Sequence, residues 1–120
     1  MTLAMVDVAS LTKKQNDALR IGERLACSIA AKRAGNKRFV VLSPFKDKGA
    51  REEGYAKLPW RFRVARYEIR AELLEGHTSR SMAEDYEDRV VESLDEALRL
   101  MTKWAPSASF EPNGEVGAPF

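Results

Sequence analysis

The sequence predicts an α+β domain with a small two- or three-stranded antiparallel sheet packed against two amphipathic helices, followed by an extended C-terminal tail. Apolar residues recur with helical spacing over residues 13–34 and 82–103. Over residues 65–73 they alternate with charged residues, as in a strand that buries one face. Prolines and glycines are frequent near the C-terminus. We therefore expect residues 1–104 to form a single domain and residues 105–120 to form the tail.

Capping signals delimit the first helix. Thr12 and Gln15 have the spacing of a capping box, in which each side chain bonds the backbone N–H of the other residue. Gly35 suits the end of the helix because glycine readily adopts the left-handed conformation. Small residues recur every four positions and would let another element pack closely. These residues are Ala18, Gly22, Ala26 and Ala30.

Two strands are predicted between the helices. Residues 39–42 form an apolar run that a Ser-Pro turn follows, which indicates a buried strand. Over residues 65–73 the odd positions are apolar or aromatic and all four even positions are charged, so we expect one buried and one solvated face. Phe62 and Val64 have the opposite parity, which predicts a bulge or a bend near Val64 and Ala65.

Residues 82–103 admit two interpretations. Their apolar side chains gather on one half of a helical wheel, and residues 81–84 have the spacing of a capping box, which favours one long helix. Residues 93–96 form a second such box, so a short strand could instead end at residues 90–91 before a helix that begins at Leu94. We prefer the long helix because acidic residues are poor strand formers.

Charge and composition exclude several classes of protein. The 20 basic and 18 acidic residues give a net charge of +2, which identifies no partner. Seventeen basic and nine acidic residues lie before residue 81, whereas three basic and nine acidic residues lie from there on. One cysteine and one histidine exclude an internal disulfide and a histidine-rich metal site. No apolar run reaches the ~18 residues of a membrane span, so we expect a cytoplasmic protein without membrane contact.

Few residues suggest catalysis. His77 lies in a Gly-His-Thr-Ser turn, and no nucleophile and base have the spacing of a known pair. Cys27 falls on the polar side of the first helix, where we expect an unreactive small side chain. No phosphate-binding glycine motif or metal-ligand spacing is present. We therefore expect no enzyme activity, no cofactor and no metal.

The preferred function is protein binding, by an accessory subunit, an adaptor or a small inhibitor. An acidic stripe with helical spacing could bind a basic groove on a partner, although such a stripe is also typical of a solvated helix face. Its residues are Glu84, Asp88, Glu92 and Glu96. Apolar residues of the tail could anchor it on a partner, on a second copy or on its own domain. They are Phe110, Val116 and Phe120. We expect the tail to contribute little to the stability of the fold.

Nucleic-acid binding is the alternative function. Basic residues cluster at the end of the first helix and along the long strand, and on one shared face they would bind phosphates. They are Lys32, Arg33, Lys37, Arg38, Arg61, Arg63, Arg66 and Arg70. The charged segment between Pro44 and Pro59 is predicted to be a surface loop in which Phe45 or Tyr55 could stack on a base. Pairing of these cations with nearby acids is the competing interpretation.

Overall fold

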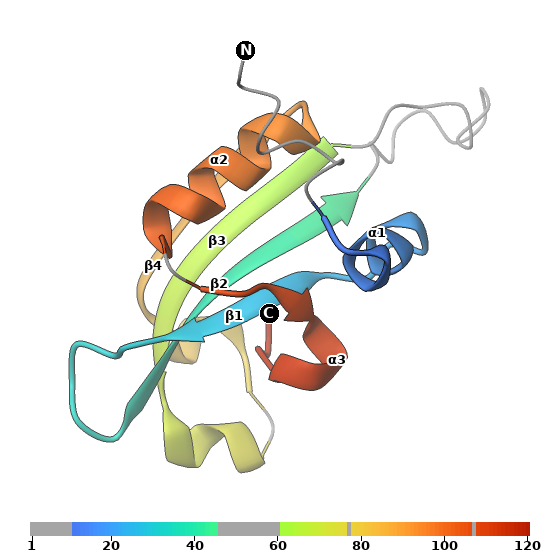
Figure 1. The fold of residues 1–120 in the computed structure, drawn as a ribbon. Helices are drawn as coiled ribbons and strands as arrows, with labels where there is room; N and C mark the ends of the chain where they lie inside the picture. Colours follow the sequence, from blue (N-terminus) through green and yellow to red (C-terminus); the bar gives the residue numbers. More distant parts are fainter. Residues whose placement is uncertain (1–10, 46–60, 77, 107) are drawn as a thin grey trace, which may run out of the picture.

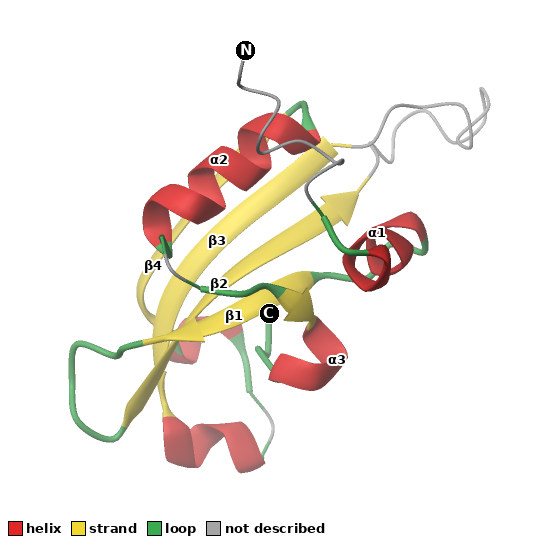
Figure 2. Ribbon diagram, in the orientation of Figure 1, coloured by secondary structure: helices red, strands yellow, loops and turns green. Residues whose placement is uncertain are grey.

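Five antiparallel strands form the centre of the fold, in the order β4-β3-β2-β1-β5 (Figures 1 and 2). This computed structural model describes residues 11–45, 61–76, 78–106 and 108–120. The strands are β1 (Leu25–Ile29), β2 (Asn36–Phe45), β3 (Arg61–Arg70), β4 (Glu84–Val91) and β5 (Glu111–Pro112). The fold is α+β, but the prediction of a two- or three-stranded sheet is wrong, because both stretches predicted as long helices contain a strand and the tail contains another.

Among the described residues, three α-helices and two short 3-10 helices surround the sheet. They are α1 (Lys13–Arg20), α2 (Leu94–Trp104), α3 (Asn113–Val116), η5 (Ala71–Glu75) and η6 (Arg80–Met82). No helix among the described residues is long and apolar enough to cross a membrane. The predicted loop over residues 46–59, with Tyr55, and the turn residue His77 lie outside the described residues.

The first helix begins as predicted but ends early. Thr12 Oγ1 accepts a hydrogen bond from the N–H of Gln15 at 3.1 Å, and the N–H of Thr12 donates to Gln15 Oε1 at 2.8 Å, so the capping box is confirmed. The helix then stops, Gly22 adopts a φ of +81°, and the chain continues as β1. Leu25 and Cys27 bury one face of β1 and Ala26 buries the other, and this continuous burial resembled a helical pattern.

The prediction of one long helix over residues 82–103 is wrong, and the alternative interpretation is confirmed. Residues 84–91 form β4, and α2 begins at Leu94 with Ser93 as its N-cap. Ser93 Oγ accepts from the N–H of Glu96 at 3.1 Å, as the second capping box predicted. β4 lies at the edge of the sheet, where charged side chains remain solvated and also discourage pairing with other chains. Acidic residues are therefore compatible with this strand.

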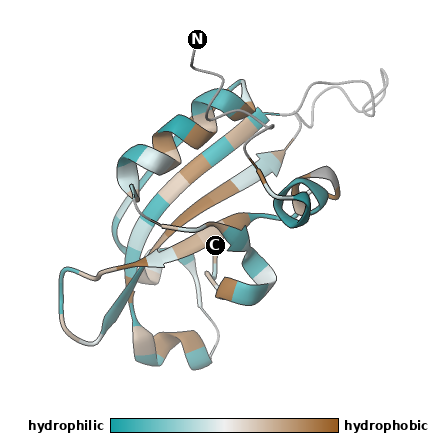
Figure 3. Cartoon of the chain, viewed as in Figure 1, coloured by the Kyte–Doolittle hydropathy of each residue, from teal (hydrophilic) through white to brown (hydrophobic). Residues whose placement is uncertain are grey.

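The two faces of the sheet pack against different elements. The α2-side face carries Phe62 and Val64 of β3 and packs against α1 and α2. The C-terminal face carries Tyr67 and Ile69 and packs against η5 and residues 116–120. Figure 3 shows the resulting bands of hydrophobic and hydrophilic residues along β3.

No bulge accounts for the change of parity in β3. The register with β2 is continuous from Arg61 to Arg70, so Val64 and Ala65 simply face opposite, covered sides. The irregularity lies instead in the pairing of β3 with β4, where β4 has one extra residue and Asp85 adopts a φ of +52°. The predicted solvated face is also wrong at Glu68, which is fully buried.

The C-terminal residues are part of the fold and not an extended tail. β5 pairs with β1, with Pro112 opposite Leu25. Ala118 belongs to the core of the C-terminal face, against which Val116 and Phe120 also pack, while Phe110 packs against the core of the α2-side face. The three predicted anchors therefore contact the chain's own domain.

Candidate functional site

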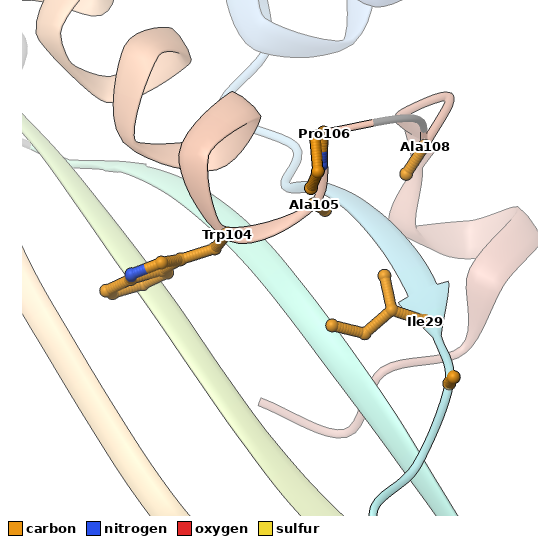
Figure 4. Close-up of a pocket in the computed structure, with 6 residues that line it drawn as sticks. Ile29, Trp104, Ala105, Pro106 and Ala108 are labelled. Carbon is orange, nitrogen blue, oxygen red and sulfur yellow. The ribbon is translucent and has the colours of Figure 1, made fainter.

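An apolar pocket with a volume of about 410 Å³ lies where α2 ends beside β1 (Figure 4). We call it the Trp104 pocket. Its lining residues are Ile29, Ala30, Trp104, Ala105, Pro106 and Ala108. The pocket exists because α2 covers only part of the α2-side face. The helix ends at Trp104, Pro106 follows two residues later, and a proline cannot continue a helix with its missing N–H.

Neighbouring strands hold the Trp104 side chain in place. The Arg66 guanidinium of β3 lies 4.4 Å from the centre of the indole ring, close enough for a cation–π contact. Arg66 also donates to Glu87 of β4 at 2.6 and 3.0 Å. This hydrogen bonding holds the pKa of Glu87 below its usual value. Because Arg66 is fixed from both sides, Trp104 forms a pre-ordered wall of the pocket.

A buried carboxylate fixes the turn that carries Ala30. Glu68 of β3 is fully buried and accepts hydrogen bonds from four donors. The donors are the N–H of Lys32 at 2.8 Å, the N–H of Arg33 at 3.1 Å, Asn36 Nδ2 at 2.7 Å and Arg38 Nη1 at 3.5 Å. Burial opposes the charged carboxylate, but these bonds outweigh it and lower the pKa of Glu68 to about 2. These hydrogen bonds to Glu68 thus fix the turn between β1 and β2.

The carboxylates near this site are paired with arginines. Arg38, itself buried, neutralises Glu68, and Arg66 neutralises Glu87. No group of three His, Cys, Asp or Glu side chains in the described part of the chain could hold a metal ion. Cys27 lies in the core and not on a helix surface, and burial raises the pKa of its thiol to about 11. An apolar pocket beside an aromatic wall can receive an apolar group of a ligand.

The predicted basic residues do not share one face. Lys32 and Arg33 lie in the β1–β2 turn, and the alternation of the strands divides the other six. The α2-side face receives Arg38, Arg66 and Arg70, and the C-terminal face receives Lys37, Arg61 and Arg63. Several of them form ion pairs with acids. These pairs are Arg33–Glu84, Arg38–Glu68, Arg63–Asp88, Arg66–Glu87 and Arg70–Glu72.

Two of the predicted basic residues, Arg61 and Arg63, contact the aromatic ring of Phe45. Arg61 and Arg63 lie 5.7 and 5.4 Å from the centre of the Phe45 ring, on the part of the C-terminal face nearest the start of β3. We call these three residues the Phe45 patch. Arg63 also lies 3.6 Å from Asp88, which partly neutralises it.

The predicted acidic stripe does not form because its residues are not on one helix. Glu84 and Asp88 belong to β4 and lie on opposite sides of its bulge, and Glu92 lies in the turn before α2. Glu96 is in the first turn of α2, where its Oε1 accepts from Ser93 Oγ at 3.2 Å. The acids therefore follow the sheet edge and the adjoining turn.

Trp104 was not predicted as a site residue. The sequence gives one local signal for it. Trp104 ends an apolar helix face and lies two residues before Pro106, which indicates the end of the helix. No protein-family model, curated protein or solved structure matches this chain, so its function is inferred from the residues described above.

Proposed function

We propose that this chain is a non-enzymatic protein-binding module, an accessory subunit, an adaptor or a small inhibitor, whose Trp104 pocket receives apolar side chains of a partner protein. The observation that carries the proposal is the apolar pocket walled by Trp104. Tryptophan is among the residues that contribute most to binding energy at protein interfaces, particularly where it borders a pocket that excludes water. A cytoplasmic location remains a prediction from the sequence.

The rigidity of the pocket supports this function. Arg66 and Glu87 fix the aromatic wall, and the bonds of Glu68 fix the turn that carries Ala30. Binding therefore orders few additional side chains of the pocket. Less of the free energy gained by burying apolar area is lost as conformational entropy, so the affinity is higher.

Affinity purification of the tagged chain tests the proposal, with Ala30→Phe as the blocking variant. Ala30 is exposed, so the larger ring should occupy the pocket without disturbing the core. Ser28→Phe is the matched control, because Ser28 is exposed two residues earlier, in β1, and is not one of the residues that line the pocket. We expect a stoichiometric partner protein with the wild type and Ser28→Phe, and its loss with Ala30→Phe at an unchanged melting temperature. Recovery of the wild-type chain alone would contradict the proposal.

The Phe45 patch favours a second candidate function, the binding of single-stranded nucleic acid. A base could stack on Phe45 while Arg61 and Arg63 contact the adjoining phosphates. Fluorescence anisotropy with a labelled single-stranded oligonucleotide tests it. Affinity should fall with salt by a log–log slope of about −0.7 per phosphate contacted, and Arg63→Gln should weaken it more than Arg99→Gln on α2. Absence of binding at low salt would remove this candidate.

A further inference from the structure

β4 is the longest strand edge left open among the described residues. It has eight residues, it pairs with β3 on one side, and no described strand lies on its other side. The opposite edge of the sheet is β5, which has two residues and packs against α1 and α3. An open edge presents a row of unpaired backbone N–H and C=O groups, to which a further strand can bind.

The charge of this edge determines which strand it could accept. Residues 84–92 contain five acids and one base, Arg89. Asp85 and Glu92 are exposed along this edge and the turn that follows it, while Glu84, Glu87 and Asp88 pair with Arg33, Arg66 and Arg63. Two copies of β4 would bring these acids together, so a second copy of the chain is disfavoured. A strand rich in lysine or arginine would instead complement them.

We propose that β4 binds a basic, extended segment of a partner protein, which adds to the sheet as a sixth strand. Backbone hydrogen bonds along the open edge would supply affinity, and the acids would select the positively charged segment. Val90, which is 40% exposed, provides an apolar contact for one residue of the added strand. This surface is separate from the Trp104 pocket and extends the proposed protein-binding function to a second site.

NMR titration of the isotope-labelled full chain tests the proposal with two ten-residue peptides, one of alternating Lys and Val and one of alternating Glu and Val. We expect the Lys-Val peptide to shift the backbone amides of β4 and the Glu-Val peptide to leave them unchanged. Shifts confined to other elements, equal shifts with both peptides, or no shifts at millimolar peptide would overturn the proposal. Concentration-dependent shifts in β4 without peptide would identify a second copy as the occupant and would also overturn it.

Charge variants sharpen the test. Asp85→Asn with Glu92→Gln removes two negative charges, and asparagine tolerates the left-handed backbone of residue 85. This double variant should weaken binding of the Lys-Val peptide by about 2- to 10-fold, as expected for two exposed charge contacts. Asp17→Asn with Glu23→Gln, which removes two acids near the opposite edge, is the matched control and should bind as the wild type does. Equal affinity of the two double variants would contradict the role of charge.

The pocket variant separates this proposal from the proposed function. Ala30→Phe lies outside β4, so it should bind the Lys-Val peptide with unchanged affinity even if it loses the partner protein. A failure of the Lys-Val peptide alone would leave the Trp104 pocket as the docking site, whereas a failure of partner recovery alone would leave the β4 edge.

Discussion

The two faces of β3 are apolar at opposite ends of the strand. On the α2-side face, Phe62 and Val64 are buried beneath the helix, and Arg66 and Glu68 follow beyond its end. On the C-terminal face the order is reversed, with Arg61 and Arg63 first and the buried Ala65, Tyr67 and Ile69 after them. Each face is therefore apolar over about half of its length.

The polar halves differ in how their charges are satisfied. On the α2-side face the polar half is internally paired, through Glu68 with Arg38 and Arg66 with Glu87. On the C-terminal face, the polar half packs cations against the Phe45 ring. The comparison indicates that the first polar half contributes to the stability of the fold, while the second is closer to a solvated surface.

Glu68→Gln should have the largest effect. The amide cannot neutralise the buried Arg38, and one of its ends presents N–H groups to the N–H donors of the turn. We expect a loss of about 3–5 kcal/mol in the free energy of unfolding, the range found when a buried ion pair loses one partner. Glu72→Gln, at an exposed position of η5 four residues later, is the control and should change stability by less than about 0.5 kcal/mol. Urea denaturation measures both values.

The same carboxylate predicts a dependence on pH. The pKa of Glu68 in the folded chain is about 2, lower than its ordinary value of 4.5. Its stabilising contribution should therefore be complete above pH 4.5 and should disappear as the pH falls towards 2. Glu68→Gln should show a smaller loss of stability over this window than the wild type, and an identical pH profile for the two proteins would contradict the charged network.

Met101→Ala tests the apolar half of the α2-side face. Met101 is a fully buried residue of α2 in the core between this helix and the sheet, so its truncation removes apolar contacts and leaves a cavity. We expect a loss of about 2–5 kcal/mol in the free energy of unfolding. Lys103→Ala, at an exposed position of the same helix, should be nearly neutral. Similar stability of the two variants would show that α2 does not pack on the sheet as described.

Removal of residues 117–120 tests the apolar half of the C-terminal face. It deletes the buried Ala118 and leaves the buried amide of Asn113 without the bonds it makes to that residue at 2.9 and 3.0 Å. We expect a loss of about 2–3 kcal/mol, mostly from the unsatisfied buried amide and the lost apolar contacts of Phe120. Thermal denaturation of the dilute chain measures it. An unchanged melting temperature would instead support the sequence-based expectation that the C-terminus contributes little to the fold.

Local signals were the ones that the sequence allowed us to predict. The capping box at Thr12, the buried strand over residues 39–42 and the strand that begins before Ala65 were predicted from neighbours along the chain, and all three are present in the structure. The helix at Leu94 could also be predicted from its N-cap, although the long-helix interpretation was preferred. These elements are α1, α2 and the neighbouring strands β2 and β3.

The remaining features depend on contacts between distant segments. β1 is covered on both faces, so its burial has no strand period, and β4 tolerates acids only because it is an edge. The candidate site also depends on contacts between distant segments. Arg66 was named from the sequence as a cation for nucleic acid, but its place above Trp104 and beside Glu87 requires α2 to fold back over the sheet.

Tyr67→Phe should have the smallest effect and isolates one contact of the C-terminal face. The variant keeps the ring against Phe39, Tyr86 and Phe120, whose ring centres lie 5.8, 5.9 and 4.8 Å away. It removes the hydroxyl, which donates to the carbonyl of Phe120 at 2.7 Å and accepts from its N–H at 3.1 Å. We expect a loss of about 1–2 kcal/mol, and almost none for Tyr86→Phe, whose hydroxyl bonds an exposed aspartate.

Alkaline unfolding distinguishes this hydroxyl from a general effect of the substitution. Burial raises the pKa of Tyr67 to about 12 from an ordinary value of 10. The neutral hydroxyl therefore stabilises the folded chain fully below pH 10, and this contribution should be lost as the pH rises through 12. Tyr67→Phe should lose less stability than the wild type over that window, while Tyr86→Phe retains the Tyr67 contribution. Parallel profiles for the wild type and Tyr67→Phe would show that the hydroxyl of Tyr67 is not held against the carbonyl of Phe120.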